Sequence, residues 1–307
     1  MTPSPAGETA AAPGREEGGR AEPWTVLRLI RWSADYLAEH GVDAPRLDAE
    51  HLLAHAVGVG RLQLYLDFDR PLDPVELDRF RPLLRRRAAR EPLQYIVGRA
   101  AFRELELTVD PRVLIPRPET EVLVDHVLAW ARGRKALDAA DVGTGSGCIA
   151  LSLLREGPFA RVWGVDVSAG ALEVAVANAR RLPEGSGAFI PVLGAGVAAL
   201  SAGLQVDVVA ANPPYVRDGE MDGLPAEVRD HEPHVALFAG PDGMAVFRTL
   251  VEEVPARLRP GGLLALEVGA DQGPEVRELV SASTAFHEVA LHRDLAGRHR
   301  IVTAVCR

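Results

Sequence analysis

The segment DVGTGSGCIALSLL, residues 141–154, constrains the fold more than any other part of this sequence. It predicts a strand that ends at Asp141, a turn with glycines at Gly143, Gly145 and Gly147, and then an apolar helix. Glycine lets the backbone turn sharply and approach a ligand closely because it has no side chain. The spacing is neither the G-x-G-x-x-G of dinucleotide folds nor a Walker loop, which would continue with Gly-Lys-Ser/Thr. The loop therefore indicates a ligand site in an α/β fold, although on its own it could be only a tight turn.

An acidic residue ends the next expected strand. The segment RVWGVDVS places Asp166 23 residues after Gly143, where a carboxylate can accept hydrogen bonds from both hydroxyls of a ribose. Taken alone, Asp166 or Ser168 could equally cap a helix. A ribose-binding acid beside a loop without a phosphate-binding signature indicates a nucleoside ligand that lacks phosphates. S-adenosylmethionine is the common ligand of that kind.

A third motif, NPPY, follows the apolar strand at residues 208–211 and comprises Asn212, Pro213, Pro214 and Tyr215. Prolines cannot extend a strand ladder, so they hold this turn rigid. The motif resembles the signature of methyltransferases that modify a planar nitrogen conjugated with a π system. The Asn212 side-chain oxygen and the Pro213 carbonyl would accept both N–H groups, which orients the nitrogen lone pair for transfer. Tyr215 would pack against the planar group. The alternative is a chance Pro-Pro turn.

Hydrophobic patterning divides the chain into four parts. Residues 1–23, rich in Ala, Gly, Pro and Glu, are expected to form a disordered tail. Residues 24–98 predict a small helical domain, with helices over 24–40, from Pro45 towards Gly58, and from Pro74 onwards. The strand-like LELTV and VLI lie in a predicted β-hairpin linker over 99–116. Residues 117–307 begin with a helix from 119 to 131 and then alternate strands and helices, which predicts a mostly parallel sheet covered on both faces.

Composition excludes several classes of function. The net charge of −9 and pI near 5.5 weaken the case for a nucleic-acid substrate, because such binding relies on Lys and Arg neutralising phosphates. No apolar run reaches the ~18 residues of a membrane span. The amino-terminal residues lack the apolar stretch of a secretion signal. With only two cysteines, a disulfide framework is not expected, and a reducing cytoplasm is the simplest location.

Six segments together resemble the HemK/PrmC family of release factor glutamine methyltransferases, over nearly all of residues 24–307. They are REPLQYIVG (90–98), LIPRPETEVLV (114–124), NPPY, EVRDHEPHVALFAGPDGMAVFRTL (227–250), RPGGLLALEVGADQ (259–272) and DLAGRHR (294–300). The resemblance implies a Rossmann-like, seven-stranded class I methyltransferase sheet and S-adenosylmethionine as cofactor. It also implies methylation of N5 of the glutamine in the Gly-Gly-Gln loop of bacterial class 1 release factors. The helical domain and the hairpin AFRELELTV would then dock the release factor and close the site.

The resemblance also assigns roles by motif position. Cofactor contacts fall on Gly143, Thr144, Gly145, Ser146, Gly147, Asp166 and Asn212. Substrate contacts fall on Asn212, Pro213, Pro214 and Tyr215, of which Asn212, Pro213 and Tyr215 are expected to be catalytic. Phe102 and residues 117–121 would wall the cofactor, although the acids there could simply favour a helix start. His231, Glu232 and His234 have no third ligand nearby in the sequence, so no metal is expected. We expect a monomer with neither a membrane nor a direct nucleic-acid partner.

One position departs from the family pattern. The family usually carries Ser-Asp or Gly-Asp in the segment before NPPY, and the carboxylate of that aspartate lies near the adenine amino group. This chain has Gly194-Ala195 at that point. Alanine cannot accept that hydrogen bond, so cofactor affinity is in question. A weakly active paralogue is therefore one alternative. Two others stay open independently of this position: a nucleic-acid N6-adenine methyltransferase, which would use the same NPPY chemistry, and a catalytically silent binding module that keeps the fold.

Overall fold

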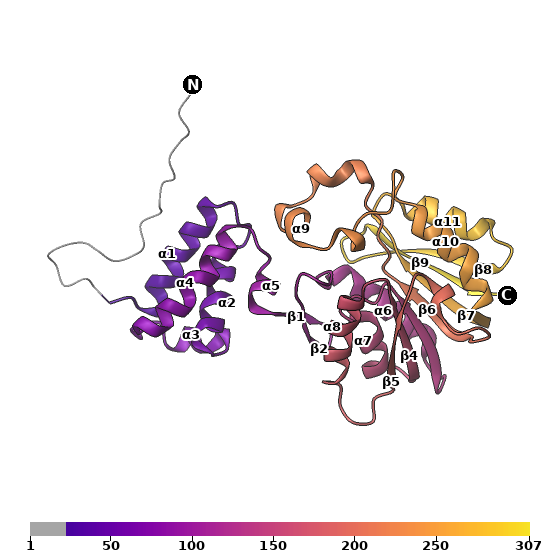
Figure 1. Ribbon diagram of the computed structural model, residues 1–307, viewed down its shortest axis with the longest axis horizontal. Coiled ribbons are helices and arrows are strands. Elements are labelled where there is room, and N and C mark those ends of the chain that lie inside the picture. Colours follow the sequence, from indigo (N-terminus) through magenta and orange to yellow (C-terminus); the bar gives the residue numbers. More distant parts are fainter. Residues whose placement is uncertain (1–22) are drawn as a thin grey trace, which may run out of the picture. The chain divides into compact units, whose positions relative to one another are not determined.

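The structure, a computed structural model, describes residues 23–307, which divide into two compact units (Figure 1). The first unit ends at Ala89 and the second runs from Arg90 to Arg307. The expected tail over residues 1–23 lies, apart from Pro23, outside the described residues. The division falls nine residues before the end of the helical domain expected at residue 98, so residues 90–98 lie with the second unit.

The first unit is helical. Its elements are α1 (Val26–Glu39), α2 (Pro45–Val57), α3 (Arg61–Leu66) and α4 (Pro74–Ala88). Three of them begin where the sequence predicts, and α4 starts with a capping box in which Asp73 and Glu76 satisfy each other's backbone N–H groups. The six residues of α3 are too few to show a helical repeat, and it was not predicted. A buried ion pair of 2.7 Å joins Arg87 of α4 to Asp48 of α2.

The second unit begins with α5 (Leu93–Val97) and an antiparallel hairpin, β1 (Arg99–Phe102) and β2 (Leu105–Thr108). The expectation of a strand at VLI, residues 113–115, is wrong, because this segment has no strand partner. Side chains take the place of a ladder there: the Tyr95 hydroxyl donates to the Val113 carbonyl at 2.6 Å, and Ile115 N–H donates to Glu232 at 3.4 Å. The segment is therefore buried and ordered without being a strand.

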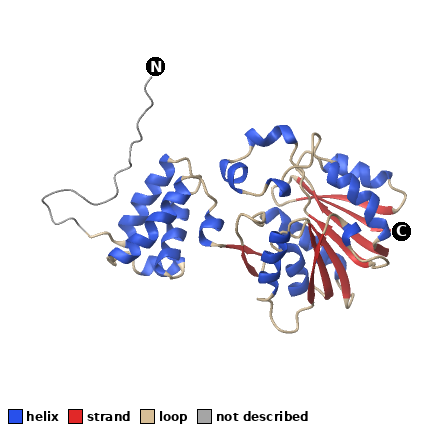
Figure 2. Ribbon diagram, viewed as in Figure 1, coloured by secondary structure: helices blue, strands red, loops and turns tan. Residues whose placement is uncertain are grey.

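A mixed sheet of seven strands forms the centre of this unit, as the sequence resemblance predicted (Figure 2). The spatial order is β5-β4-β3-β6-β7-β9-β8. The first five strands in that order run parallel to one another, whereas β9 pairs antiparallel with both β7 and β8. The strands are β3 (Leu137–Val142), β4 (Phe159–Asp166), β5 (Ala188–Leu193), β6 (Val206–Ala211), β7 (Leu258–Glu267), β8 (Phe286–Arg293) and β9 (His299–Cys306).

Helices cover both faces of the sheet, so each central strand is buried on both sides. On β6, Val208 and Ala210 pack in one core with α6 and α7, whereas Val209 and Ala211 pack in the other with α10 and α11. The α-helices of this part are α6 (Pro118–Ala131), α7 (Cys148–Glu156), α8 (Ala169–Ala179), α9 (Ala226–His231), α10 (Ala245–Glu253) and α11 (Gly273–Ala282). Short 3-10 turns lie at Val197–Ala199, Asp218–Gly223, His234–Ala236 and Val254–Ala256. Across residues 23–307, every helix is too short or too polar to cross a bilayer.

Candidate active site

Three neighbouring parallel strands bring the sequence motifs to one edge of the sheet. Val142 at the end of β3 lies level with Val165 of β4 and Ala211 of β6. The loops that follow these strands therefore leave the sheet side by side, at its carboxyl edge, where ligands of open α/β sheets bind.

A cavity of about 430 Å³ opens at this edge. Among its lining residues are Gly143, Gly145, Asp166, Asn212, Pro213 and Pro214. The structure thus gathers into one cavity six of the ten residues that the motifs single out. Its lining is mainly apolar, which suits a ligand with a large uncharged surface.

The glycine loop takes a shape that other residues would strain. Gly143, Gly145 and Gly147 have φ angles of 75°, 54° and 84°, in the left-handed region that favours glycine. At Gly147 an added Cβ would also lie only 3.1 Å from a Leu151 methyl group. Gly143 and Gly145 reach the cavity wall, so the loop combines a tight turn with backbone exposed to a ligand.

The remaining loop residues face inward. Asp141 is fully buried and accepts hydrogen bonds from the Thr144 hydroxyl at 2.7 Å and from Ala150 N–H at 3.1 Å. Burial raises the pKa of Asp141 to about 7. Thr144 and Ser146 are almost completely buried, and Gly147 caps α7. These three expected cofactor residues are outside the cavity lining, and the contacts of Thr144 and Gly147 shape the loop.

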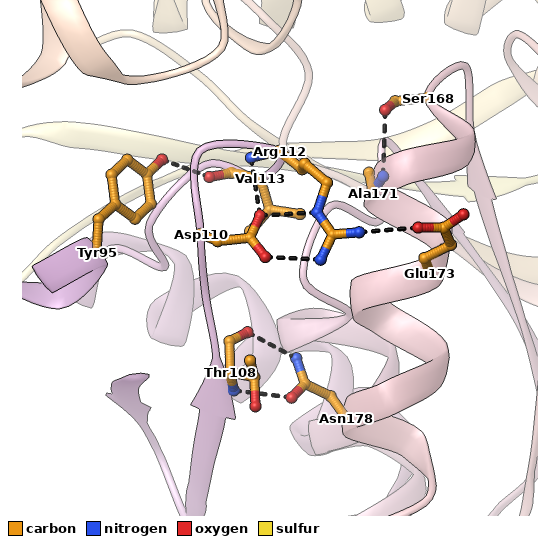
Figure 3. A network of polar contacts seen from close by, with 9 residues as sticks. All are labelled: Tyr95, Thr108, Asp110, Arg112, Val113, Ser168, Ala171, Glu173 and Asn178. Carbon is orange, nitrogen blue, oxygen red and sulfur yellow. Dashed lines mark hydrogen bonds and ion pairs between the residues drawn. The ribbon is translucent and has the colours of Figure 1, made fainter. Parts of the chain in front are cut away.

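Asp166 connects the ends of β3 and β4. Its two carboxylate oxygens accept hydrogen bonds from Gly145 N–H and Ser168 N–H, both at 2.9 Å. The helix-capping role belongs to Ser168, whose hydroxyl accepts from Ala171 N–H at the start of α8 (Figure 3). Each carboxylate oxygen can accept more than one hydrogen bond, so Asp166 can hold the loop and still bind hydroxyl groups in the cavity.

The NPPY turn forms another wall of the cavity. The Asn212 side-chain amide donates to the Thr120 hydroxyl at 3.2 Å, from β6 across to α6. Tyr215 lies beyond the main cavity and lines a neighbouring one of about 160 Å³ with Gln272 and Arg300. The Gln272 side-chain amide holds the turn by donating to the Tyr215 carbonyl at 3.0 Å. Burial raises the pKa of Tyr215 to about 12, so its hydroxyl stays neutral.

Two expected cofactor contacts lie elsewhere. Phe102 is 1% exposed and packs in the core with Leu107 and Leu123. Arg117 forms an ion pair of 2.5 Å with the buried Glu232, so the PRPETE segment is tied to the loop after NPPY. Glu232 is thus an ion-pair partner, and among the described residues no three His, Cys, Asp or Glu side chains are grouped to hold a metal.

Residues 112–114, for which the sequence did not predict a place at the ligand site, form part of the cavity wall. Figure 3 shows how this segment is held: the Arg112 guanidinium pairs with Asp110 at 2.7 Å and with Glu173 of α8 at 2.8 Å. Asn178 of α8 bonds both backbone groups of Thr108, at 2.8 and 3.0 Å (Figure 3). The nearby LIPRPETEVLV segment was the only sequence signal for this wall.

The departure at Ala195 lies in the cavity. Gly194, Ala195 and Gly196 line it together with part of α10. Glu253, at the end of α10, packs so closely against Gly196 that an added Cβ there would lie 2.6 Å from its carboxylate oxygen Oε2. Within the described residues this buried oxygen has no hydrogen-bond partner. A carboxylate is therefore present close to the loop that lacks its usual acid.

Comparison with known proteins shows the family to which this chain is similar. Residues 28–98 match the family described as PrmC N-terminal domain, and residues 118–226 match the methyltransferase small domain. A release factor glutamine methyltransferase of Moorella thermoacetica is 45% identical over 283 residues, which cover 92% of this chain and 99% of the relative. The enzyme of the same name from Geobacter sulfurreducens is 40% identical, with 92% and 97% covered. The enzyme of that name from Chlorobaculum tepidum is 43% identical over a stretch that covers 87% of this chain and 92% of the relative.

Proposed function

The chain belongs to the release factor glutamine methyltransferase family, and we propose that it methylates N5 of the glutamine in the Gly-Gly-Gln loop of bacterial class 1 release factors. It is accordingly a methyltransferase that acts on a protein. The observation that carries the finer proposal is the position of Asn212 and Pro213, which line one cavity with Gly143 and Asp166. The groups that would bind the glutamine amide and those that would bind a nucleoside therefore line the same cavity.

We propose S-adenosylmethionine as the cofactor, because the residues present fit it. The Asp166 carboxylate can accept ribose hydroxyls, and the Gly143 and Gly145 backbone allows close approach without phosphate-binding groups. The apolar remainder of the cavity suits an adenine ring and a thioether chain. The bound cofactor supplies a methyl group on a positively charged sulfur. Of the expected cofactor residues, Thr144, Ser146 and Gly147 are proposed to act on the shape of the loop.

The NPPY turn would prepare the glutamine side chain for attack. An amide nitrogen is a poor nucleophile because its lone pair is delocalised. The Asn212 side-chain oxygen and the Pro213 carbonyl would accept its two N–H groups, and the fixed backbone of the two prolines holds the second acceptor in place. Acceptors that are already oriented stabilise the positive charge that develops on nitrogen. Pro214 and Tyr215 would complete the amide pocket.

The partner and setting follow from the same proposal. The helical unit would contact the release factor, while the sheet unit holds the cofactor; residues 24–98, 99–116 and 117–307 are the proposed functional divisions. We propose a cytoplasmic monomer that needs neither a metal nor a nucleic-acid substrate. A nucleic-acid N6-adenine methyltransferase would use the same NPPY chemistry, but the net charge of −9 does not favour a polyanionic partner.

Methyl transfer can be tested directly by incubating the protein with S-adenosylmethionine labelled on its methyl group. Release factor, a release factor whose Gly-Gly-Gln glutamine is replaced by alanine, DNA and ribosomal RNA serve as separate acceptors. We expect label in the intact release factor alone. Label in either nucleic acid would favour the adenine alternative, and no transfer despite cofactor binding would indicate a silent binding module.

A further inference from the structure

Three polar side chains from different elements meet beside the cavity. Asn212 follows β6 and Glu267 ends β7, and because Ala211 lies level with Leu266 in these parallel strands, the two side chains start from adjacent positions. Thr120, in the first turn of α6, lies between them in the hydrogen-bond chain. The Asn212 Nδ2 group donates to Thr120 Oγ1 at 3.2 Å. The Thr120 hydroxyl also lies near enough to the Glu267 carboxylate to lower the pKa of that group.

The chemistry of a hydroxyl group gives this chain a direction. A threonine hydroxyl has one proton to donate, whereas an ionised carboxylate can only accept. When the Thr120 hydroxyl donates its hydrogen bond to Glu267, Thr120 Oγ1 can only accept a hydrogen bond from its other neighbour, Asn212. The neighbouring atom of Asn212 must then be the Nδ2 donor, which leaves the Oδ1 acceptor at the opposite end of the planar amide.

Burial makes the arrangement costly to break. Thr120 and Glu267 are each 1% exposed, and a buried polar group that loses its hydrogen-bond partner destabilises the folded state. One Glu267 oxygen, Oε2, already lacks a partner in the described structure, so the bond from Thr120 is a main source of compensation. Reversing the Asn212 amide would place two acceptors against each other.

We infer that Thr120 and Glu267 are positioning residues that fix the Asn212 side-chain amide with its oxygen available to the substrate nitrogen. This inference rests on the proposed function, because it explains how the acceptor in the glutamine pocket is selected. Neither residue lines the cavity. Their effect is on the orientation of Asn212, and hence on turnover more than on cofactor binding.

The arrangement should depend on pH. Burial raises the pKa of Glu267 to about 7. Arg300 and Arg117 lower it and Glu119 raises it, while Tyr215 is also close enough to interact with Glu267. Above pH 7 the ionised Glu267 carboxylate accepts a hydrogen bond from the Thr120 hydroxyl. Below it the protonated acid becomes a donor, which frees Thr120 to donate to Asn212 and allows the amide to reverse. Turnover should therefore fall as the pH drops through about 7.

Single-turnover methylation of release factor by the full chain tests the inference, with Thr120→Val, Thr120→Ser and Glu267→Gln compared with the parent. Valine keeps the shape but removes the hydroxyl, whereas serine keeps the hydroxyl. We expect Thr120→Val to slow transfer roughly tenfold or more, as misorientation of a reacting group does, and Thr120→Ser to recover most of the rate. Cofactor affinity, measured by calorimetry, should stay within about threefold in all three.

The pH profile gives a second readout that a purely structural role would not change. Glutamine cannot ionise, so the turnover of Glu267→Gln should lack the parent's rise near pH 7. The inference is overturned if Thr120→Val matches the parent rate, if serine is as slow as valine, if Glu267→Gln keeps the parent's profile, or if cofactor binding is lost. A parent that methylates no release factor would refute the proposed function as well. A parent that is active with an equally active valine variant refutes only the role of Thr120.

Discussion

The Asn212 side chain supplies the acceptor that the proposed chemistry needs most. Replacing Asn212 with alanine removes the oxygen that is proposed to orient the substrate amide, and loss of one such group typically costs ~100-fold or more in turnover. Single-turnover methylation of release factor measures the effect. Gln205→Ala, which removes an exposed amide just before the other end of β6, is the matched control and should react like the parent. If Asn212→Ala methylates glutamine at the parent rate, the mechanism is incorrect.

Ala195 offers a test of cofactor recognition at a single position. Ala195→Asp should tighten S-adenosylmethionine binding, because a hydrogen bond to a charged group contributes about 1.5–3 kcal/mol, or roughly 10- to 150-fold in affinity. Titration calorimetry measures the change. The acceptor specificity should not alter, because Ala195 lies on the 194–196 wall of the cavity and not in the NPPY turn.

The control for this variant is the nearby carboxylate of Glu253. Its charge would repel a new aspartate, so the double variant with Glu253→Gln should bind the cofactor at least as tightly as Ala195→Asp alone. Glu253→Gln by itself shows how much the existing carboxylate contributes. Unchanged or weaker affinity in both aspartate variants would mean that adenine is held by another group.

At single positions, the sequence identified residues whose role is encoded locally. Gly143, Gly145, Asp166 and the Asn-Pro-Pro turn follow directly from strand ends, and the structure places them in one cavity. Arg112 reaches the same cavity only because the chain folds back over α8, and Thr120 reaches Asn212 across two elements. Contacts of that kind depend on the path of the whole chain, which no local pattern specifies.

At the level of elements, Asn178 joins the hairpin to helix α8. It accepts from Thr108 N–H and donates to the Thr108 carbonyl (Figure 3). It also donates to the Ser146 carbonyl, so it links β2, the glycine loop and α8. The strand prediction at LELTV was right, whereas VLI failed because its backbone groups bond to side chains instead of another strand. Apolar runs alone cannot distinguish these two cases.

Removing this link should destabilise the second unit. Asn178→Leu removes the side chain that bonds the buried Ser146 carbonyl and both half-buried backbone groups of Thr108. A buried group that loses its partner costs about 1–3 kcal/mol. We expect the free energy of unfolding, measured by urea denaturation, to fall by at least one such increment. Arg180→Ala, at an exposed position just after α8, should change it by less than about 0.5 kcal/mol. Equal stability of the Asn178 variant and the parent would show that water replaces the lost bonds.

For the whole molecule, alternation of strands and helices was enough to predict a covered, mostly parallel sheet. The number of strands, seven, came only from the family resemblance. The antiparallel placement of β9 between β7 and β8 was not predicted, because strand order depends on contacts distant in sequence. The boundary between the two units, near residue 90, was also not evident from the sequence. Residues 90–98 look helical, yet Tyr95 is buried with Val109, Val113 and Ala171 of the second unit.

This boundary determines how the two units should be separated. Removing residues 1–89 leaves Tyr95 and its 2.6 Å hydrogen bond to Val113, whereas removing residues 1–100 deletes both from a wall that supports the cavity. The shorter deletion should bind S-adenosylmethionine within about threefold of the full chain, because all the cavity residues remain. Thermal unfolding should show a lower Tm for the longer deletion than for the shorter one.

Transfer to intact release factor should be nearly abolished in the chain that lacks residues 1–89, since the helical unit is proposed to contact that partner. A short peptide containing Gly-Gly-Gln is the control: it bypasses docking, so both the full chain and the truncated chain should methylate it at similar, slow rates. Calorimetry and methyl labelling on the same samples separate the two properties. Lost cofactor affinity would mean that the second unit does not fold alone, and undiminished transfer to release factor would mean that docking resides in residues 90–307.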